Sequence, residues 1–148
     1  MAELDATTTG QNNSDWDHFI TKLEAAELEF VQGRPEDFKS LWSHTDDVTL
    51  SGGLGGDIEV GWTNVAARLD RVSPKYAEGR RSRQEFSCHV GSDFAYLVQK
   101  EFIEARMGAQ VERSKDELRV TMIFRRRSDG WRIVHRHADS QISVSEPQ

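Results

Sequence analysis

Side chains able to do acid–base or ligand-binding chemistry gather near the C-terminus, in the stretch from Trp131 to Asp139. Polar and apolar residues alternate there, as on a β-strand, where neighbouring side chains point to opposite faces. One face carries two imidazoles and a carboxylate, from His135, His137 and Asp139. The other face carries Arg136 between apolar residues. The pattern therefore predicts two different chemistries, and only one of them faces the interior.

The turn before this strand decides which face lies inside. A two-residue turn at Asp129 and Gly130 would place the histidines beside the apolar row of the preceding strand. A three-residue loop from Ser128 to Gly130, with Gly130 in the left-handed conformation, would place Arg136 there instead. A one-residue change of register exchanges the two faces of a strand, so the spacing leaves both arrangements open.

An inward Arg136 needs a counter-charge, because burying a lone guanidinium is costly. Glu101 is the expected partner, since it shares a strand face with Leu97 and Gln99. Two interpretations follow. Arg136 binds the carboxylate of a small ligand in a bidentate fork, or it forms a structural ion pair with Glu101.

The histidines and the surface arginines have simpler interpretations. His135 and His137 are spaced to share a metal ion, but no companion motif accompanies them. We therefore expect no metal site and a surface or dimer-interface role, which would make association sensitive to pH. The basic groups Arg125–Arg127 and Arg80–Arg83 are expected to be solvated charges on exposed strands.

Composition narrows the class of protein. The chain has 148 residues with 19 Lys and Arg against 25 Asp and Glu, a net charge of −6, which argues against a general nucleic-acid binder. No apolar run approaches the ~18 residues of a membrane span. The single cysteine, Cys88, excludes a zinc site built on several thiolates. The glycine loop Gly52–Gly56 lacks the Lys-Ser/Thr of a phosphate cradle. We expect a cytoplasmic protein with no cofactor.

Helices precede strands along the chain. Apolar spacing predicts helices over 15–32, 35–42 and 63–72, with a short strand at Val48–Leu50. Alternation then predicts strands over 80–90, 94–106, 117–127 and 131–140. This order indicates an α+β domain over 14–140. Residues 1–13 are expected to form a disordered arm and 141–148 a flexible tail.

This order of elements, with the terminal hairpin FRRRSDGWRIVHRHAD (Phe124 to Asp139), resembles the SnoaL-like branch of the nuclear transport factor 2-like superfamily. Within it the chain is most similar to the association domain of calcium/calmodulin-dependent protein kinase II. The resemblance implies a cystatin-like cone, in which a curved antiparallel sheet wraps three N-terminal helices, with a pocket at its mouth and a homodimer through the sheet. The family's similar turn favours the three-residue loop, so we expect Arg136 inside and the histidines outside.

The catalytic pattern of ketosteroid isomerases, members of the same superfamily, is not matched. Ser51-Gly52-Gly53 stands where their aspartate base is needed, the first helix has no tyrosine, and Thr121 falls near their protonated acid. We therefore expect a small-molecule-binding or association domain for a small anionic organic ligand. The expected ligand-binding residues are Arg136, Glu101, Arg119, Gln99, Trp62, His135 and His137.

Two alternatives remain open. One is a SnoaL-like acid–base enzyme acting on a hydrophobic ring substrate, with Glu101, His135 or His137 as proton carrier. The other is a purely structural oligomerisation unit, expected if side chains fill the pocket. A free buried acid in the pocket would favour the enzyme, and an acid neutralised by arginine would favour binding.

Overall fold

The computed structural model of the chain describes residues 2–140, with side chains from Ser14 onward. Its elements are α1 (Ala2–Phe30), α2 (Glu36–Ser40), β1 (Thr49–Ser51), β2 (Glu59–Val60), α3 (Trp62–Val72), the 3₁₀ turn η1 (Ser73–Lys75), β3 (Tyr76–Val90), β4 (Phe94–Met107), β5 (Arg113–Arg127) and β6 (Gly130–Ser140). The α+β class predicted from the sequence is confirmed. The predicted tail over 141–148 lies outside the described residues.

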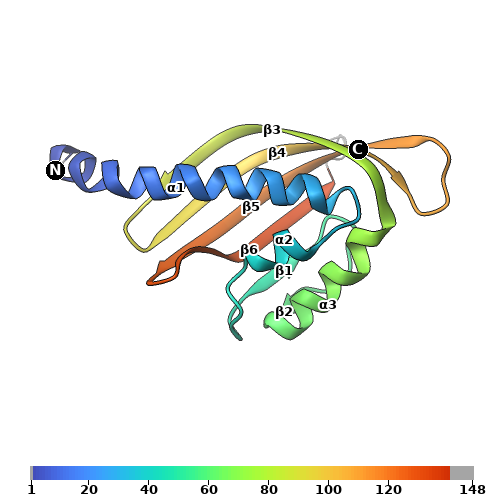
Figure 1. The fold of residues 1–148 in the computed structure, drawn as a ribbon, viewed down its shortest axis with the longest axis horizontal. Helices are drawn as coiled ribbons and strands as arrows, with labels where there is room; N and C mark the ends of the chain where they lie inside the picture. The colour runs from blue at the N-terminus through green and yellow to red at the C-terminus, as the bar shows by residue number, and fades with distance from the viewer. Residues whose placement is uncertain (1, 141–148) are drawn as a thin grey trace, which may run out of the picture.

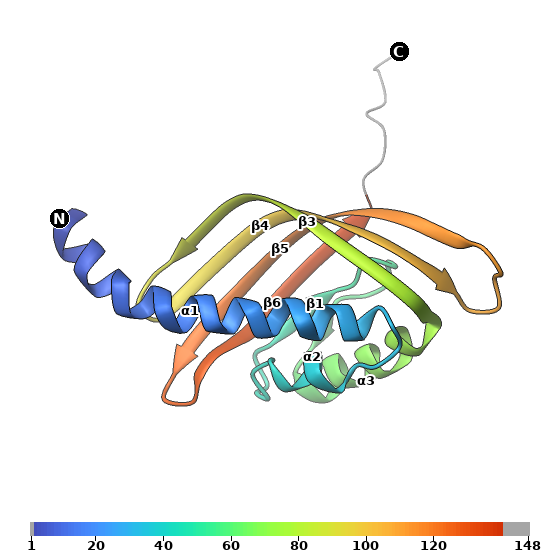
Figure 2. The same cartoon turned by 45° about the horizontal axis from the view of Figure 1, so that its top comes forward.

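One curved sheet forms the body of the fold. Its strand order is β2-β1-β6-β5-β4-β3, and the four long strands pair antiparallel as a meander. The sheet arches over α1, while α2 and α3 close one end of its concave side (Figure 1, Figure 2). The expectation of a purely antiparallel sheet is wrong at one edge. There β1 runs parallel to β6, with Leu50 paired to Arg136.

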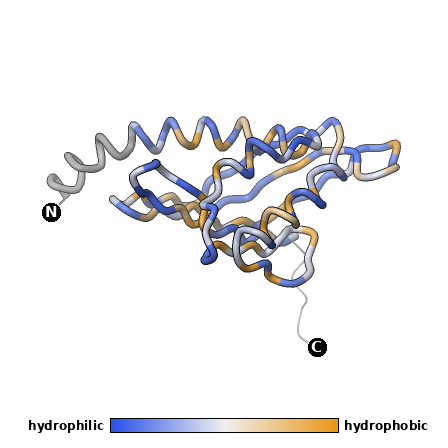
Figure 3. Tube along the Cα trace, turned by 60° about the horizontal axis from the view of Figure 1, so that its bottom comes forward, coloured by the Kyte–Doolittle hydropathy of each residue, from blue (hydrophilic) through white to orange (hydrophobic). Residues whose placement is uncertain are grey.

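Helix α1 lies across the concave face with its apolar stripe inward. Phe19, Leu23 and Ala26 are buried at the predicted spacing. Apolar and polar residues alternate along the helix and the strands (Figure 3). The helix spans Ala2–Phe30, so the start predicted at residue 15 is wrong. Residues 2–13 contain no proline that would end the helix earlier.

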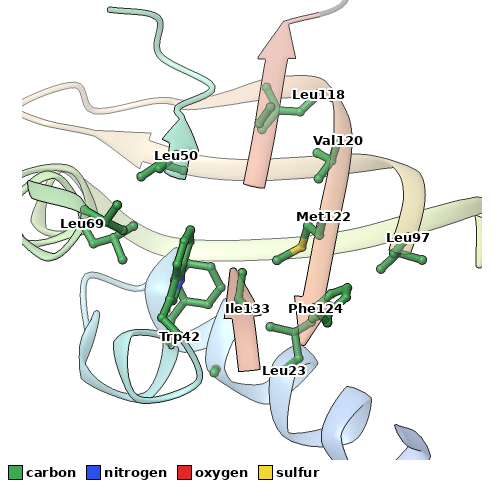
Figure 4. Close-up of a cluster of buried hydrophobic side chains, with 14 of the residues drawn as sticks. Leu23, Trp42, Leu50, Leu69, Leu97, Leu118, Val120, Met122, Phe124 and Ile133 are labelled. Carbon is green, nitrogen blue, oxygen red and sulfur yellow. The ribbon is translucent and has the colours of Figure 1, made fainter. Parts of the chain in front are cut away.

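An aromatic core fills one end of the concave side. The ring of Trp16 meets the rings of Phe124 and Trp131 edge-on, with centroids 4.9 and 5.3 Å apart. Phe19 meets Phe124 in the same way at 5.6 Å. Figure 4 shows the apolar cluster continuing from Phe124 past Met122 toward Leu118. Aromatic and other apolar side chains therefore fill this end of the concave side.

A β-bulge in β6 decides the register of the last hairpin. The turn holds Ser128 and Asp129, and Gly130 has the expected positive φ of 99°. The three-residue loop is therefore wrong, because Gly130 already pairs with the preceding strand. Val134 is an extra residue, since Ile133 pairs with Phe124 while the next paired residues are His135 and Ile123. The bulge turns Ile133 inward before it and Arg136 inward after it.

Candidate functional site

A cavity of about 80 Å³ lies between the C-terminal end of α1, the glycine loop after β1, α3 and the inner face of β3 to β6. Most of its wall is apolar and comes from Phe30, Leu50, Leu69, Ile103 and Leu118. Five charged residues supply its polar wall: Arg68 on α3, together with Glu27 on α1, Arg81 on β3, Glu101 on β4 and Arg136 on β6. Arg68 pairs with Glu59 at 3.4 Å. The other four residues contact one another, and we call these four the ion cluster.

Arg136 and Glu101 form the tightest pair of the ion cluster. Arg136 Nη2 donates to Glu101 Oε1 at 2.8 Å, and Nη1 donates to Oε2 at 2.9 Å. The side chain of Glu101 is 1 % exposed and that of Arg136 is 13 % exposed. The predicted partnership is confirmed, and the bidentate fork of Arg136 is occupied by protein.

Arg81 and Glu27 complete the ion cluster with looser contacts. Arg81 Nη2 lies 3.3 Å from Glu27 Oε2 and 3.2 Å from Glu101 Oε2, and Arg136 Nη1 lies 3.6 Å from Glu27 Oε2. Within residues 14–140, Arg81 Nη2 and the Glu27 carboxylate take part in no hydrogen bond of good geometry. Both side chains are nearly inaccessible, at 5 % and 7 %. Charge, rather than hydrogen bonding, holds this half of the cluster.

The two carboxylates have opposite protonation behaviour. Burial raises the pKa of Glu27 to about 7, and the attraction of Arg81 and Arg136 only partly offsets burial and the repulsion of Glu101. Burial acts in the same direction on Glu101, but Arg136 outweighs it and lowers its pKa to about 2. Glu101 is therefore a fixed anion, while Glu27 exchanges a proton near neutral pH.

A polar chain links the cluster to the surface of the sheet. Buried Gln99 donates from Nε2 to Glu101 Oε2 at 2.8 Å and accepts from Arg83 Nη1 at 3.1 Å. Arg83 in turn donates to Glu24 on α1 at 2.7 Å. Gln99 thus orients Glu101 from behind and does not line the cavity wall.

Besides Gln99, four residues expected in the ligand site lie outside the cavity. Arg119 is 60 % exposed on the outer face of the sheet and pairs with Asp139 at 2.8 Å. His137 projects from the same outer face. His135 Nδ1 lies 2.7 Å from Thr49 Oγ1, and burial lowers its pKa. Trp62 opens α3 and stacks on the imidazole of His44 with centroids 4.0 Å apart.

Metal ligands do not gather anywhere in the part of the chain that the structure describes. Groups of three or more His, Cys, Asp or Glu side chains suited to a metal are absent from it. The helices of the same residues include none long and apolar enough to cross a membrane.

The sequence did not predict Glu27 as a site residue, and Arg81 was expected to be a solvated charge on an exposed strand. Glu27 falls on the apolar stripe of α1, between Ala26 and Phe30, and an acid on such a stripe is the signal that was available. The expectation for Arg81 is wrong because β3 alternates, turning Arg81 inward toward Glu101 while Arg80 stays exposed.

Comparison with known proteins agrees with this fold. Residues 23–142 match the SnoaL-like domain family, so the chain belongs to that family. No curated protein matches the chain. Its structure is similar to a candidate calcium/calmodulin-dependent protein kinase type II association domain from Thiobacillus denitrificans, with a TM-score of 0.68 and 21 % identity over 85 % of this chain and 94 % of that one.

Two further solved structures share the fold. One is a candidate dehydratase of the nuclear transport factor 2-like family from Streptomyces avermitilis, with a TM-score of 0.75 and 18 % identity over 91 % of this chain and 99 % of that one. The other is hexachlorocyclohexane dehydrochlorinase LinA-type3 from Novosphingobium barchaimii, with a TM-score of 0.67 and 15 % identity over 98 % and 99 %. At these identities the likeness shows the fold alone.

Proposed function

We propose that this SnoaL-like domain binds a compact, mainly apolar organic molecule that carries one anionic oxygen group. The observation that carries the proposal is the composition of the cavity wall, which is mainly apolar and carries a few polar side chains, those of the ion cluster with Arg68 and Tyr76. Pockets that bind small molecules are typically apolar with a few convergent polar groups. A volume of about 80 Å³ limits the buried part of the ligand to a few heavy atoms.

The anionic group is expected at Arg81 and not at Arg136. The fork of Arg136 is occupied by Glu101. Arg81 Nη2 is buried beside the carboxylates of Glu27 and Glu101 at 3.3 and 3.2 Å without a hydrogen bond to either, so protonation of Glu27 removes one of its two counter-charges. With Glu27 ionised, two arginines balance two carboxylates. With Glu27 protonated, the cluster carries one net positive charge. An anion therefore binds best together with a proton on Glu27.

A series of straight-chain carboxylates from acetate to hexanoate tests the proposal, with the matching primary alcohols as controls. Bound ligand raises the melting temperature of the folded state, and we expect the rise to grow with chain length until the cavity is full. Arg81→Met should abolish the rise, whereas Arg119→Met, on the outer face, should leave it intact. Equal shifts from the carboxylates and the alcohols, or no shift from either, would rule out the proposed ligand class.

An acid–base enzyme is the second candidate, with Glu27 in place of the expected proton carriers. Glu101 is neutralised by Arg136, and His137 lies outside the cavity, but Glu27 lines it and titrates near neutrality. A pKa near the working pH suits a general acid or base. Two structural neighbours are named as a dehydratase and a dehydrochlorinase. Solvent deuterium incorporation into compact ketones, lost in Glu27→Gln and retained in Glu24→Gln, would support this candidate.

We further propose that the chain forms a homodimer through the outer face of the sheet. Phe94, Tyr96, Phe102 and Ile123 are exposed and share that face of β4 and β5. Exposed apolar groups gathered on one sheet face are typical of an interaction surface. Light scattering of the protein should give twice the chain mass, and Tyr96→Lys with Ile123→Lys should halve it. A monomeric mass for the unaltered chain would exclude the dimer.

A further inference from the structure

Besides the ion cluster and Arg68, the cavity wall carries the hydroxyl of Tyr76, at the start of β3. Tyr76 is 7 % exposed and lines the cavity with Glu27 and Arg81. Within residues 14–140 no side chain or backbone group donates to this hydroxyl or accepts from it. Its oxygen is not sealed in the core, unlike the unpartnered indole nitrogens of Trp42 and Trp131.

The surroundings of Tyr76 explain the ring but not the hydroxyl. Its ring packs beside Phe30 with centroids 6.2 Å apart, a contact that phenylalanine would make equally well. The hydroxyl has no protein partner but is not sealed, so a ligand or water can bind it from the accessible side. Burial raises the pKa of Tyr76, so the group is a neutral O–H donor at pH 7. Tyr76 shares the cavity wall with three arginines, Arg68, Arg81 and Arg136, and with the carboxylates of Glu27 and Glu101.

We infer that Tyr76 is a specificity-determining residue whose hydroxyl donates a hydrogen bond to the anionic group of the ligand. The inference rests on the proposed function and deepens it. A carboxylate has two acceptor oxygens, and the small cavity brings both Arg81 and Tyr76 to its wall. One oxygen pairs with the guanidinium and the other accepts from the phenol. The structure thus favours a carboxylate over an alcohol, an amine or a halide.

Tyr76→Phe removes only the hydroxyl and is the direct test, with Tyr96→Phe on the outer face as the matched control. Calorimetric titration with butyrate should give about tenfold weaker binding to Tyr76→Phe, because a hydrogen bond to a charged group is lost. Tyr96→Phe should bind like the unaltered protein. The preference for butyrate over butanol should shrink by the same factor.

The melting temperature of the ligand-free variant separates this role from a structural one. If the hydroxyl binds ligand and makes no contact that stabilises the ligand-free fold, ligand-free Tyr76→Phe should melt at the same temperature as the unaltered protein or higher. Weaker binding together with that result supports the inference. Unaltered butyrate binding by Tyr76→Phe would overturn it while leaving the proposed function intact. A lack of butyrate binding by the unaltered protein would overturn both.

Discussion

The two ends of the concave side use the same strands for opposite purposes. Near the hairpin, β5 and β6 supply Phe124 and Trp131 to a solid aromatic core. Toward the other end, β6 supplies Arg136 to a cavity lined by the ion cluster. Buried charges stabilise a fold less well than apolar side chains of similar volume. We therefore expect the aromatic core to stabilise the fold more than the ion cluster and the cavity do.

The largest expected effect comes from breaking the aromatic core. Phe124→Ala should lower the free energy of unfolding by about 3–5 kcal/mol, because it leaves a cavity beneath Trp16 and Phe19. Denaturant titration measures this change. A loss below about 1 kcal/mol would mean that the aromatic end is not the main source of stability.

The ion cluster should react differently to single and double substitution. Arg136→Met alone should cost about 3–5 kcal/mol, because it leaves the Glu101 carboxylate buried without its bidentate partner. Arg136→Met with Glu101→Leu should recover most of that stability and lose carboxylate binding. If the double variant is as unstable as the single one, the pair contributes to stability, and the contrast with the aromatic core fails.

A smaller effect is expected at Glu27, and it depends on pH. Folding raises the pKa of this carboxyl from its ordinary 4.5 to about 7. Between these two pH values, the folded state therefore binds more protons than the unfolded state. This group therefore lowers stability as pH rises from 4.5 to 7, by up to about 3 kcal/mol. Glu27→Gln should remove that decline in denaturant titrations at pH 5 and pH 8, and Glu24→Gln should keep it.

The smallest effect is expected on the outer face. Arg119→Ala breaks a pair with Asp139 that is exposed to solvent, so stability should change by less than about 1 kcal/mol. Carboxylate binding should not change. Loss of carboxylate binding in this variant would show that the ligand binds at the outer face of the sheet and not in the cavity.

Much of the fold follows from periodicity, and the site follows from it only in part. The four long strands and the apolar stripe of α1 are expected from alternation and helical spacing, and Glu101 is expected as the partner of Arg136. Glu27 and Arg81 were missed because a charged residue is usually a surface residue, and only the three-dimensional meeting of α1 with β3 makes each the partner of the other. The bulge at Val134 also depends on packing, since it turns inward both Ile133 and Arg136, which strict alternation places on opposite faces.

The central claim is that an anion enters the cavity together with a proton on Glu27. Calorimetric titration of the protein with butyrate from pH 6 to pH 9 tests it most directly. Affinity should fall about tenfold per pH unit above pH 7 in the unaltered protein and stay constant in Glu27→Gln, because glutamine cannot take up the proton. The same pH dependence in both proteins, or no binding at any pH, would contradict the account.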